Sequence, residues 1–200
     1  MPVNRQAAMR AVADLLEALG YDPARDDELK QTPARVTDAL TGELLSGRNV
    51  DLRALIERDA AHCLGEQTTP SVVVRDIDVA TMCPHHLLPA YGSATVAYHP
   101  GQRMLGLGTL AKIVDACSRQ LVLQERIGER VVEVLMTHGQ AQGAYCSLSL
   151  WHSCLGIRGA RQPRATVHTR ALAGTLARPE RLMELELGRG SAGDPNRCLG

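Results

Sequence analysis

Between residues 71 and 176 the chain contains two β-rich segments, then a long helical stretch, then two more β-rich segments. β-branched or alternating residues predict strands at 71–80, 92–100, 144–154 and 164–176. The stretch at 108–139 repeats apolar residues at helical spacing, which predicts two helices with a break near 121–124. Strand pairs on either side of a helical stretch predict an α+β domain with an antiparallel sheet and helices on one face.

The residues before this domain follow a helical pattern instead. Apolar side chains recur at helical spacing over 5–19, between 32 and 47, and in a short stretch at 51–60. Residues 189–200 are rich in glycine and polar side chains, which is typical of a flexible tail. We therefore expect a helical region at 1–65, the main domain at 66–188 and a tail at 189–200.

The charge balance and the hydropathy exclude several classes of protein. Lys and Arg number 22 and Asp and Glu number 22, so the chain lacks the basic field of a nucleic-acid-binding protein. We expect no membrane span, because no run of about 18 apolar residues occurs. The first twenty residues lack the apolar core of a signal peptide, so we expect a cytoplasmic protein. Its six cysteines are then expected to be thiols or metal ligands rather than disulfides.

Two short segments carry residues that bind metals. The first, CPHH, places Cys83 and His86 three positions apart in a turn. The second, WHSC, lies in the predicted strand at 144–154, where alternation puts His152 and Cys154 on one face, about 7 Å apart. Cys83, His86 and Cys154 together predict a zinc site, since three such ligands with an open position are typical of catalytic zinc.

Two other interpretations of these segments stay open at this point. His85 or His152 would be the fourth ligand of a closed, structural site. Alternatively, the cysteines are ordinary buried thiols and the histidines are structural residues, with no metal. In the three-ligand interpretation, His85 and His152 stand beside the metal and are free for proton transfer.

The metal-binding segments lie within longer stretches that closely resemble the GTP cyclohydrolase I family. These stretches are CPHHLLPAYGSATVAYHP at 83–100, LGLGTLAKIVDACSRQLVLQERI at 105–127 and LWHSCLGIRG at 150–159, and TPARV at 32–36 adds to them. The resemblance covers roughly residues 5–185. It implies a tunnelling fold, in which a four-stranded antiparallel sheet is backed by two long helices. It also implies a toroidal homodecamer with active sites at subunit interfaces.

The resemblance also implies roles for individual residues. The zinc ligands would be Cys83, His86 and Cys154, and the proton-transfer pair would be His85 and His152. The guanine ring would be held by Gln124 and Glu125. The physical reason is clear for Glu125, whose carboxylate can accept hydrogen bonds from both N1–H and the amino group of guanine. The triphosphate would be contacted by Arg158, Lys112 and Arg35, with Arg35 coming from a neighbouring subunit.

The activity implied is the zinc-dependent, hydrolytic opening of the imidazole ring of GTP at C8. Formate is released, and ring closure gives 7,8-dihydroneopterin triphosphate for a pterin or folate-type pathway.

This sequence departs from the family pattern at Pro84, which replaces Glu, and at Gly108 and Thr109, which replace Ser and Lys. It departs again at Lys112, which replaces Arg. Two alternatives therefore remain. One is a paralogue that acts on a less phosphorylated or different purine nucleotide, or stops at ring opening. The other is an inactive, purine-binding member.

Overall fold

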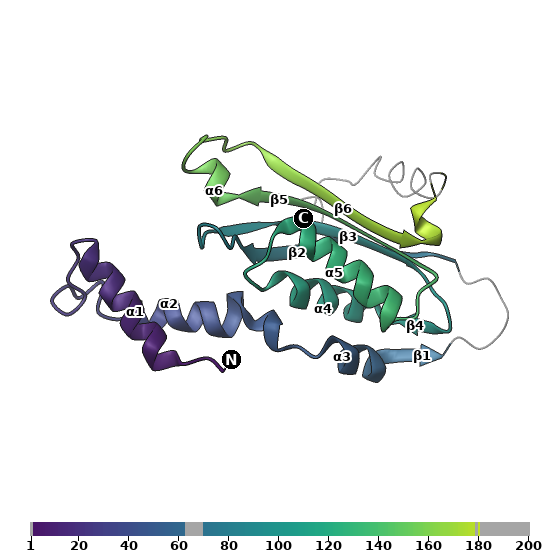
Figure 1. Cartoon of the computed structure of the whole chain (residues 1–200), viewed down its shortest axis with the longest axis horizontal. Helices are drawn as coiled ribbons and strands as arrows, with labels where there is room; N and C mark the ends of the chain where they lie inside the picture. The colour runs from purple at the N-terminus through teal and green to yellow at the C-terminus, as the bar shows by residue number, and fades with distance from the viewer. Residues whose placement is uncertain (1, 63–69, 179, 181–200) are drawn as a thin grey trace, which may run out of the picture.

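The computed structural model describes residues 2–62, 70–178 and 180 (Figure 1). The stretches predicted as helical before the domain form helices and helical turns, and their N-terminal part extends as an arm away from the sheet. Its elements are α1 (Arg5–Ala18), α2 (Thr32–Asp38), the π-helical turn η1 (Ala39–Leu44), the 3-10 turn η2 (Ser46–Asn49) and α3 (Leu52–Asp59). An ion pair of 2.7 Å between Arg5 and Asp38 joins α1 to α2.

The four predicted strands form one antiparallel sheet in the order β2-β3-β5-β6. Their bounds are β2 (Val72–Met82), β3 (Pro89–His99), β5 (Gly143–His152) and β6 (Thr166–Gly174). The register places Ala90 of β3 opposite His152 of β5, so the turn after β2 and the end of β5 lie at the same end of the sheet. A small sheet of β1 (Ala60–His62) and β4 (Arg103–Leu105) was not predicted.

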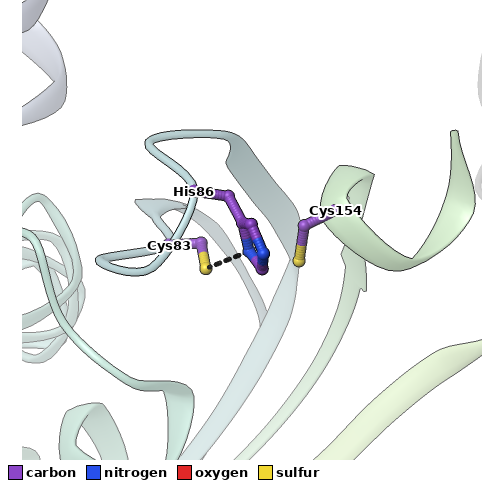
Figure 2. Close-up of side chains that lie close together, drawn as sticks. All are labelled: Cys83, His86 and Cys154. Atoms are coloured by element: carbon purple, nitrogen blue, oxygen red, sulfur yellow. Dashed lines mark hydrogen bonds between the residues drawn. The ribbon is translucent and has the colours of Figure 1, made fainter. Parts of the chain in front are cut away.

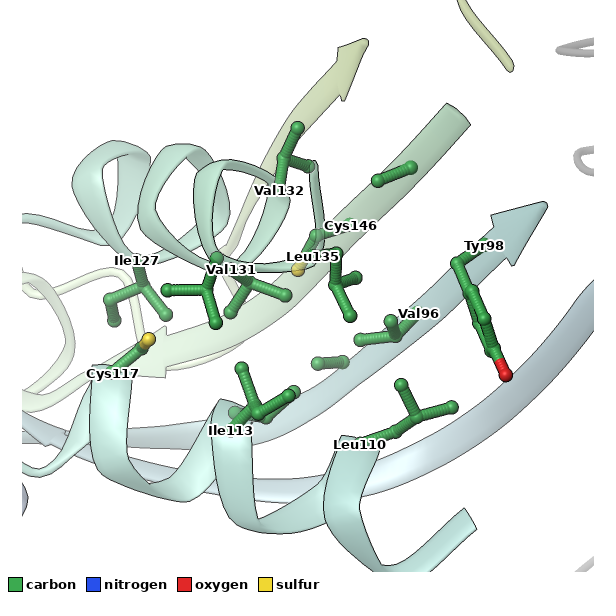
Figure 3. Close-up of a cluster of buried hydrophobic side chains, with 14 of the residues drawn as sticks. Val96, Tyr98, Leu110, Ile113, Cys117, Ile127, Val131, Val132, Leu135 and Cys146 are labelled. Carbon is green, nitrogen blue, oxygen red and sulfur yellow. The ribbon is translucent and has the colours of Figure 1, made fainter. Parts of the chain in front are cut away.

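Two helices cover one face of the sheet, as predicted (Figure 1). They are α4 (Leu107–Ser118) and α5 (Gln124–Thr137), and the predicted break between them is present. Figure 3 shows their apolar faces, with Ile113 and Leu135 among them, meeting Val96 and Cys146 of the strands. All four of these side chains have no exposed surface. The predicted α+β architecture, with an antiparallel sheet and helices on one face, is confirmed.

The break between α4 and α5 also serves the site described below. Leu121 forms an isolated bridge with Met82, and the Val122 amide donates to the Met82 carbonyl at 3.4 Å. Helix α5 then begins at Gln124, directly beside the end of β2 and the turn that follows it. The loop thus brings the first residues of α5 to the end of the sheet where the metal-binding segments lie.

One sequence prediction is corrected here. The strand predicted at 144–154 ends at His152, and the next residues form a short helix, α6 (Ser153–Gly156). The Ile157 amide donates to the Ser153 carbonyl at 3.0 Å, and the Ser153 hydroxyl donates to the Pro89 carbonyl. Because of this turn, Cys154 does not share a strand face with His152.

Other predictions are tested only in part. Cys117 and Cys146 are buried in the core, and burial raises the pKa of each thiol to about 12, so both are inert side chains that fill the core. Cys63, Cys198 and the predicted tail at 189–200 lie outside the described residues. In the part of the chain that the structure describes, no helix has the length and apolar character needed to cross a membrane.

Candidate active site

The three predicted zinc ligands meet in space (Figure 2). Their ligand atoms all lie within 4.8 Å of one another, and Cys83 Sγ is 3.7 Å from His86 Nδ1. Cys83 and His86 come from the turn between β2 and β3, whereas Cys154 comes from α6 across the end of the sheet. The two segments predicted from sequence therefore form one site.

The turn between β2 and β3 explains why Cys83 and His86 converge. The Cys83 amide donates to the Leu88 carbonyl and the Leu87 amide donates to the Cys83 carbonyl, both at 2.9 Å. Leu87 adopts a positive φ of 51°, which lets the chain reverse direction within the turn. The closed turn holds the Cys83 thiol and the His86 imidazole on the same side of the turn, 3.7 Å apart.

The donor set fits zinc. Two sulfur atoms and one imidazole nitrogen are ligands that zinc prefers, and three of them leave one position open. Burial raises the pKa of the Cys154 thiol, and the neighbouring Cys83 raises it further, so a bound cation would be needed to hold Cys154 as a thiolate. Among the residues that the structure describes, neither His85 nor His152 belongs to this cluster, which favours the three-ligand interpretation over a closed site.

The side chain of Trp151, at the end of β5, fixes the position of helix α6 and so of Cys154. The Trp151 indole N–H donates to the Pro163 carbonyl at 2.8 Å, and its ring packs against Tyr91 with 5.4 Å between ring centroids. The ring lies directly over Gly156, where a Cβ atom would overlap the indole carbons. The last residue of α6 must therefore be glycine for the helix to sit where it does.

Replacing Gly156 with alanine is expected to displace α6 and reduce zinc occupancy severalfold. The added methyl group has no room beside an indole that is fixed by its hydrogen bond. Zinc content by mass spectrometry with inductively coupled plasma measures the effect. Gly108→Ala is the matched control, because that helical glycine has open space around its Cβ position. Full zinc occupancy in Gly156→Ala would contradict this role of Gly156.

A cavity of about 230 Å³ adjoins the cluster. Its walls include the three ligands and four further residues that were predicted from sequence, namely His85, His152, Gln124 and Glu125. Thr81, Pro84, Val122, Leu123 and Val167 complete the lining. None of these five side chains was predicted to take part in the chemistry, and only Pro84 was singled out in the sequence, as a departure from the family motif. The predicted metal, proton-transfer and guanine residues thus share one cavity.

The residues at the cavity wall differ in exposure and in partners. Gln124 is only 3% exposed, and its amide oxygen lies 2.8 Å from His152 Nε2. Burial lowers the pKa of His152, and the negative charge of Glu125 partly opposes that shift. Glu125 itself is exposed in the first turn of α5, where the helix dipole favours a carboxylate. The cavity therefore offers a ring nitrogen of His152 and a free carboxylate to a ligand.

Comparisons with known proteins agree with this site. The family model described as GTP cyclohydrolase I matches residues 8–187. The chain belongs to the GTP cyclohydrolase I family. GTP cyclohydrolase 1 of Leifsonia xyli is 37% identical over 182 residues, covering 91% of this chain and 93% of the relative. GTP cyclohydrolase 1 of Bacillus subtilis is 37% identical over 173 residues, covering 86% and 88%.

A solved structure also matches part of the chain. The archaeosine synthase QueF-Like in the apo form aligns with a TM-score of 0.43 and 16% identity. The match covers 54% of this chain and 97% of the QueF-Like chain.

The cluster of Cys83, His86 and Cys154 is consistent with the zinc site of GTP cyclohydrolase I.

In this member of the GTP cyclohydrolase I family, the predicted phosphate contacts are dispersed. Arg158 follows α6, and its charge partly opposes the upward shift in the pKa of Cys154, whereas Arg35 lies exposed on α2. Lys112 lies on α4, with its ammonium nitrogen 3.7 Å from the carboxylate of Asp59. These three residues are not among those that line the cavity of a single chain. Asp59 itself was not singled out from the sequence, which gives no indication of its contact with α4.

Proposed function

We propose that this protein catalyses the GTP cyclohydrolase I reaction, in which GTP and water give 7,8-dihydroneopterin triphosphate and formate. One observation carries the proposal: in a chain of this family, the Cys83–His86–Cys154 cluster shares a cavity with His152 and Glu125. The cavity combines a zinc-binding donor set, a proton-transfer group and a carboxylate.

The residues of the chain then have distinct roles. Zinc, when bound, supplies a water of lowered pKa, which provides hydroxide near neutral pH. We assign His152 to protonate N7 of the purine, which makes C8 electrophilic and allows the imidazole ring to open. His85, at the exposed side of the cavity, is assigned to a second proton transfer as C8 leaves as formate. The buried wall around Gln124 limits the approach of water from the sheet side.

Glu125 is assigned to recognise guanine. Its exposed carboxylate can accept from both N1–H and the amino group of the base, a pattern that adenine lacks. Gln124 was predicted as a second guanine contact, but because its side-chain amide already bonds to the Val167 carbonyl and to His152, we do not assign it a direct contact with the base.

Replacing Glu125 with glutamine is expected to lower kcat/KM for GTP about 10- to 100-fold, mainly through a higher KM. One charge-assisted hydrogen bond to the base is lost, and such bonds contribute about 1.5–3 kcal/mol. Steady-state kinetics of formate release measure the effect. Glu129→Gln is the matched control, because Glu129 lies on the same helix and pairs with Arg126 on the solvent side. Equal kinetics in wild type and Glu125→Gln would remove the assignment.

The assembly is proposed to be a decameric toroid with active sites between subunits. Within the described residues, the outer edges of β2 and β6 pair with no further strand, so both are available to neighbouring copies. Helix α1 has no buried residue, and Leu15 within it and Leu19 directly after it are exposed. Arg35 and Lys112 lie outside the cavity of their own chain and would join it from another subunit. Native mass spectrometry is expected to find ten copies of the 21.6 kDa chain, and a monomer would contradict the proposal.

The division into an N-terminal helical region at 1–65 and a catalytic domain at 66–188 is also proposed. The change from helices to the four-stranded sheet supports it.

A cytoplasmic location is proposed as well. It is supported by Cys117 and Cys146, two thiols outside the metal cluster that form no disulfide, as is usual in a reducing compartment.

A second candidate is a related reaction on a less phosphorylated purine nucleotide. Asp59 favours it, because the Thr109 hydroxyl donates to its carboxylate at 3.2 Å and Lys112 lies 3.7 Å away. The two positions where the family carries Lys and Arg are thus engaged with an acid in this chain.

Kinetics with GTP, GDP and GMP separate the two candidates. If GTP is the substrate, kcat/KM is expected to be roughly tenfold or more lower with GDP and GMP than with GTP, since each lost charged hydrogen bond weakens binding. Equal or higher kcat/KM with GMP would favour the second candidate.

The proposed reaction is tested by formate release. Zinc-loaded protein incubated with GTP is expected to release one formate for each GTP consumed. Metal-stripped protein is expected to release none, and activity should return when zinc is added. GTP consumption without formate would overturn the proposal.

A further inference from the structure

We propose that Gln124 is a positioning residue, whose side-chain amide fixes the imidazole of His152 in the tautomer protonated at Nε2. This inference deepens the proposed function and rests on it. It assigns Gln124 a role within the protein, acting on the substrate only through His152.

The orientation of the Gln124 amide is set by two carbonyl groups, which can only accept hydrogen bonds. Its nitrogen lies 2.9 Å from the Val167 carbonyl oxygen and 3.4 Å from the Leu148 carbonyl oxygen. It also lies 3.1 Å from the Thr169 hydroxyl oxygen. A carbonyl oxygen has no proton to donate, so the group facing both carbonyls must be the NH₂ of the amide. The amide oxygen is therefore the atom that faces His152.

The tautomer of His152 follows from this orientation. Gln124 Oε1 and His152 Nε2 are 2.8 Å apart, which is a hydrogen-bond distance. Because an amide oxygen only accepts, Nε2 must carry the proton that is shared between them. In the neutral ring, Nδ1 is then the unprotonated nitrogen. Nδ1 is thus the nitrogen of His152 that Gln124 leaves for proton exchange, and it must first take up a proton, giving imidazolium, before it can protonate N7 of a purine.

The surroundings hold this arrangement firmly. Gln124 is the first residue of α5, is 3% exposed, and bonds to residues of both β5 and β6. Flipping the amide would place its oxygen against two carbonyl oxygens and leave Nε2 facing NH₂. The first change loses buried hydrogen bonds whichever tautomer His152 adopts, because two carbonyl oxygens would then face a third acceptor. The buried amide therefore excludes the opposite tautomer, whereas the exposed carboxylate of neighbouring Glu125 remains open to a ligand.

Kinetics of Gln124→Met in the zinc-loaded protein test the inference. Methionine keeps the length of the side chain but cannot hold the imidazole in one tautomer. We expect kcat for formate release from GTP to fall about 10- to 100-fold, within the range that a proton-transfer group contributes, while KM changes less than about twofold. Gln120→Met is the matched control, since the Gln120 amide bonds to the Ala116 carbonyl away from the cavity. Its kcat and KM should equal those of the wild type.

A double-mutant cycle separates positioning from direct contact. If Gln124 acts only through His152, adding Gln124→Met to His152→Ala should lower kcat no further. A higher KM in Gln124→Met with unchanged kcat, or a further loss in the double variant, would overturn the inference and support a guanine contact.

Solid-state ¹⁵N NMR of histidine-labelled, zinc-loaded protein provides a readout that needs no Gln124 variant. The His152 signals are assigned by difference from His152→Ala. At pH 8 the wild type should show a protonated Nε2 and an unprotonated Nδ1, and any other pattern would overturn the inference. Failure of the proposed function looks different, because the wild type would then release no formate from GTP while the tautomer signals stayed as expected.

Discussion

Replacing Cys154 with serine is expected to reduce bound zinc from near-stoichiometric to a small fraction and to abolish GTP turnover. Cys154 is one of three ligand atoms that lie within 4.8 Å of one another, and it is the ligand that comes from the far segment of the chain. A serine hydroxyl is a much poorer zinc ligand than a thiolate at neutral pH, because it stays protonated. Zinc content and formate release, measured on the same preparation, check this expectation.

The control for this change is Cys117→Ala. Cys117 is 2% exposed in the core between α4 and the sheet, and its thiol is kept neutral by burial. The control should lose some stability, because a buried atom is removed, but should keep its zinc. Full zinc occupancy in Cys154→Ser would mean that the turn after β2 and helix α6 do not form one metal site.

Replacing His152 with alanine is expected to lower the rate of formate release about 10²- to 10⁴-fold while zinc remains bound. His152 lines the cavity but lies outside the ligand cluster. General acid–base groups typically contribute a rate factor of this size. Single-turnover kinetics with excess enzyme would locate the loss in ring opening rather than in product release.

His168→Ala is the control for the change at His152. His168 is exposed on β6 and bonds to Thr166, away from the cavity lining. Its kinetics should match those of the wild type. Loss of zinc in His152→Ala would show that His152 is a ligand, which would require a different division of roles among the histidines.

The sequence predicted the layers of the fold because each element carries a clear period. Alternation in β3 and β5 and helical spacing in α4 and α5 mark the apolar face of each element that enters the core between sheet and helices, although most of β5 is buried on both faces. The small β1–β4 sheet was missed, because three-residue strands are too short to show a period and form only through long-range pairing. The π-helical turn η1 was likewise predicted only as part of a longer helix.

The three predicted ligands come together in a cluster consistent with the zinc site of the family, but the reason given for their convergence was partly wrong. Alternation along one strand was expected to bring Cys154 beside His152, whereas the strand ends at His152 and α6 carries Cys154 to the cluster. That turn depends on the packing of Trp151 over Gly156, which no local pattern reveals. The bond between Gln124 and His152 joins residues 28 positions apart and also requires the folded sheet.

A mass spectrum of the products formed by zinc-loaded protein and GTP tests the central claim most directly. The account predicts the mass of 7,8-dihydroneopterin triphosphate together with formate, which would show that Gly108, Thr109 and Lys112 are compatible with the complete reaction. A product with the mass of GTP plus one water, or of that species without its formyl group, would show that the reaction stops at ring opening. Unchanged GTP would contradict the proposed function.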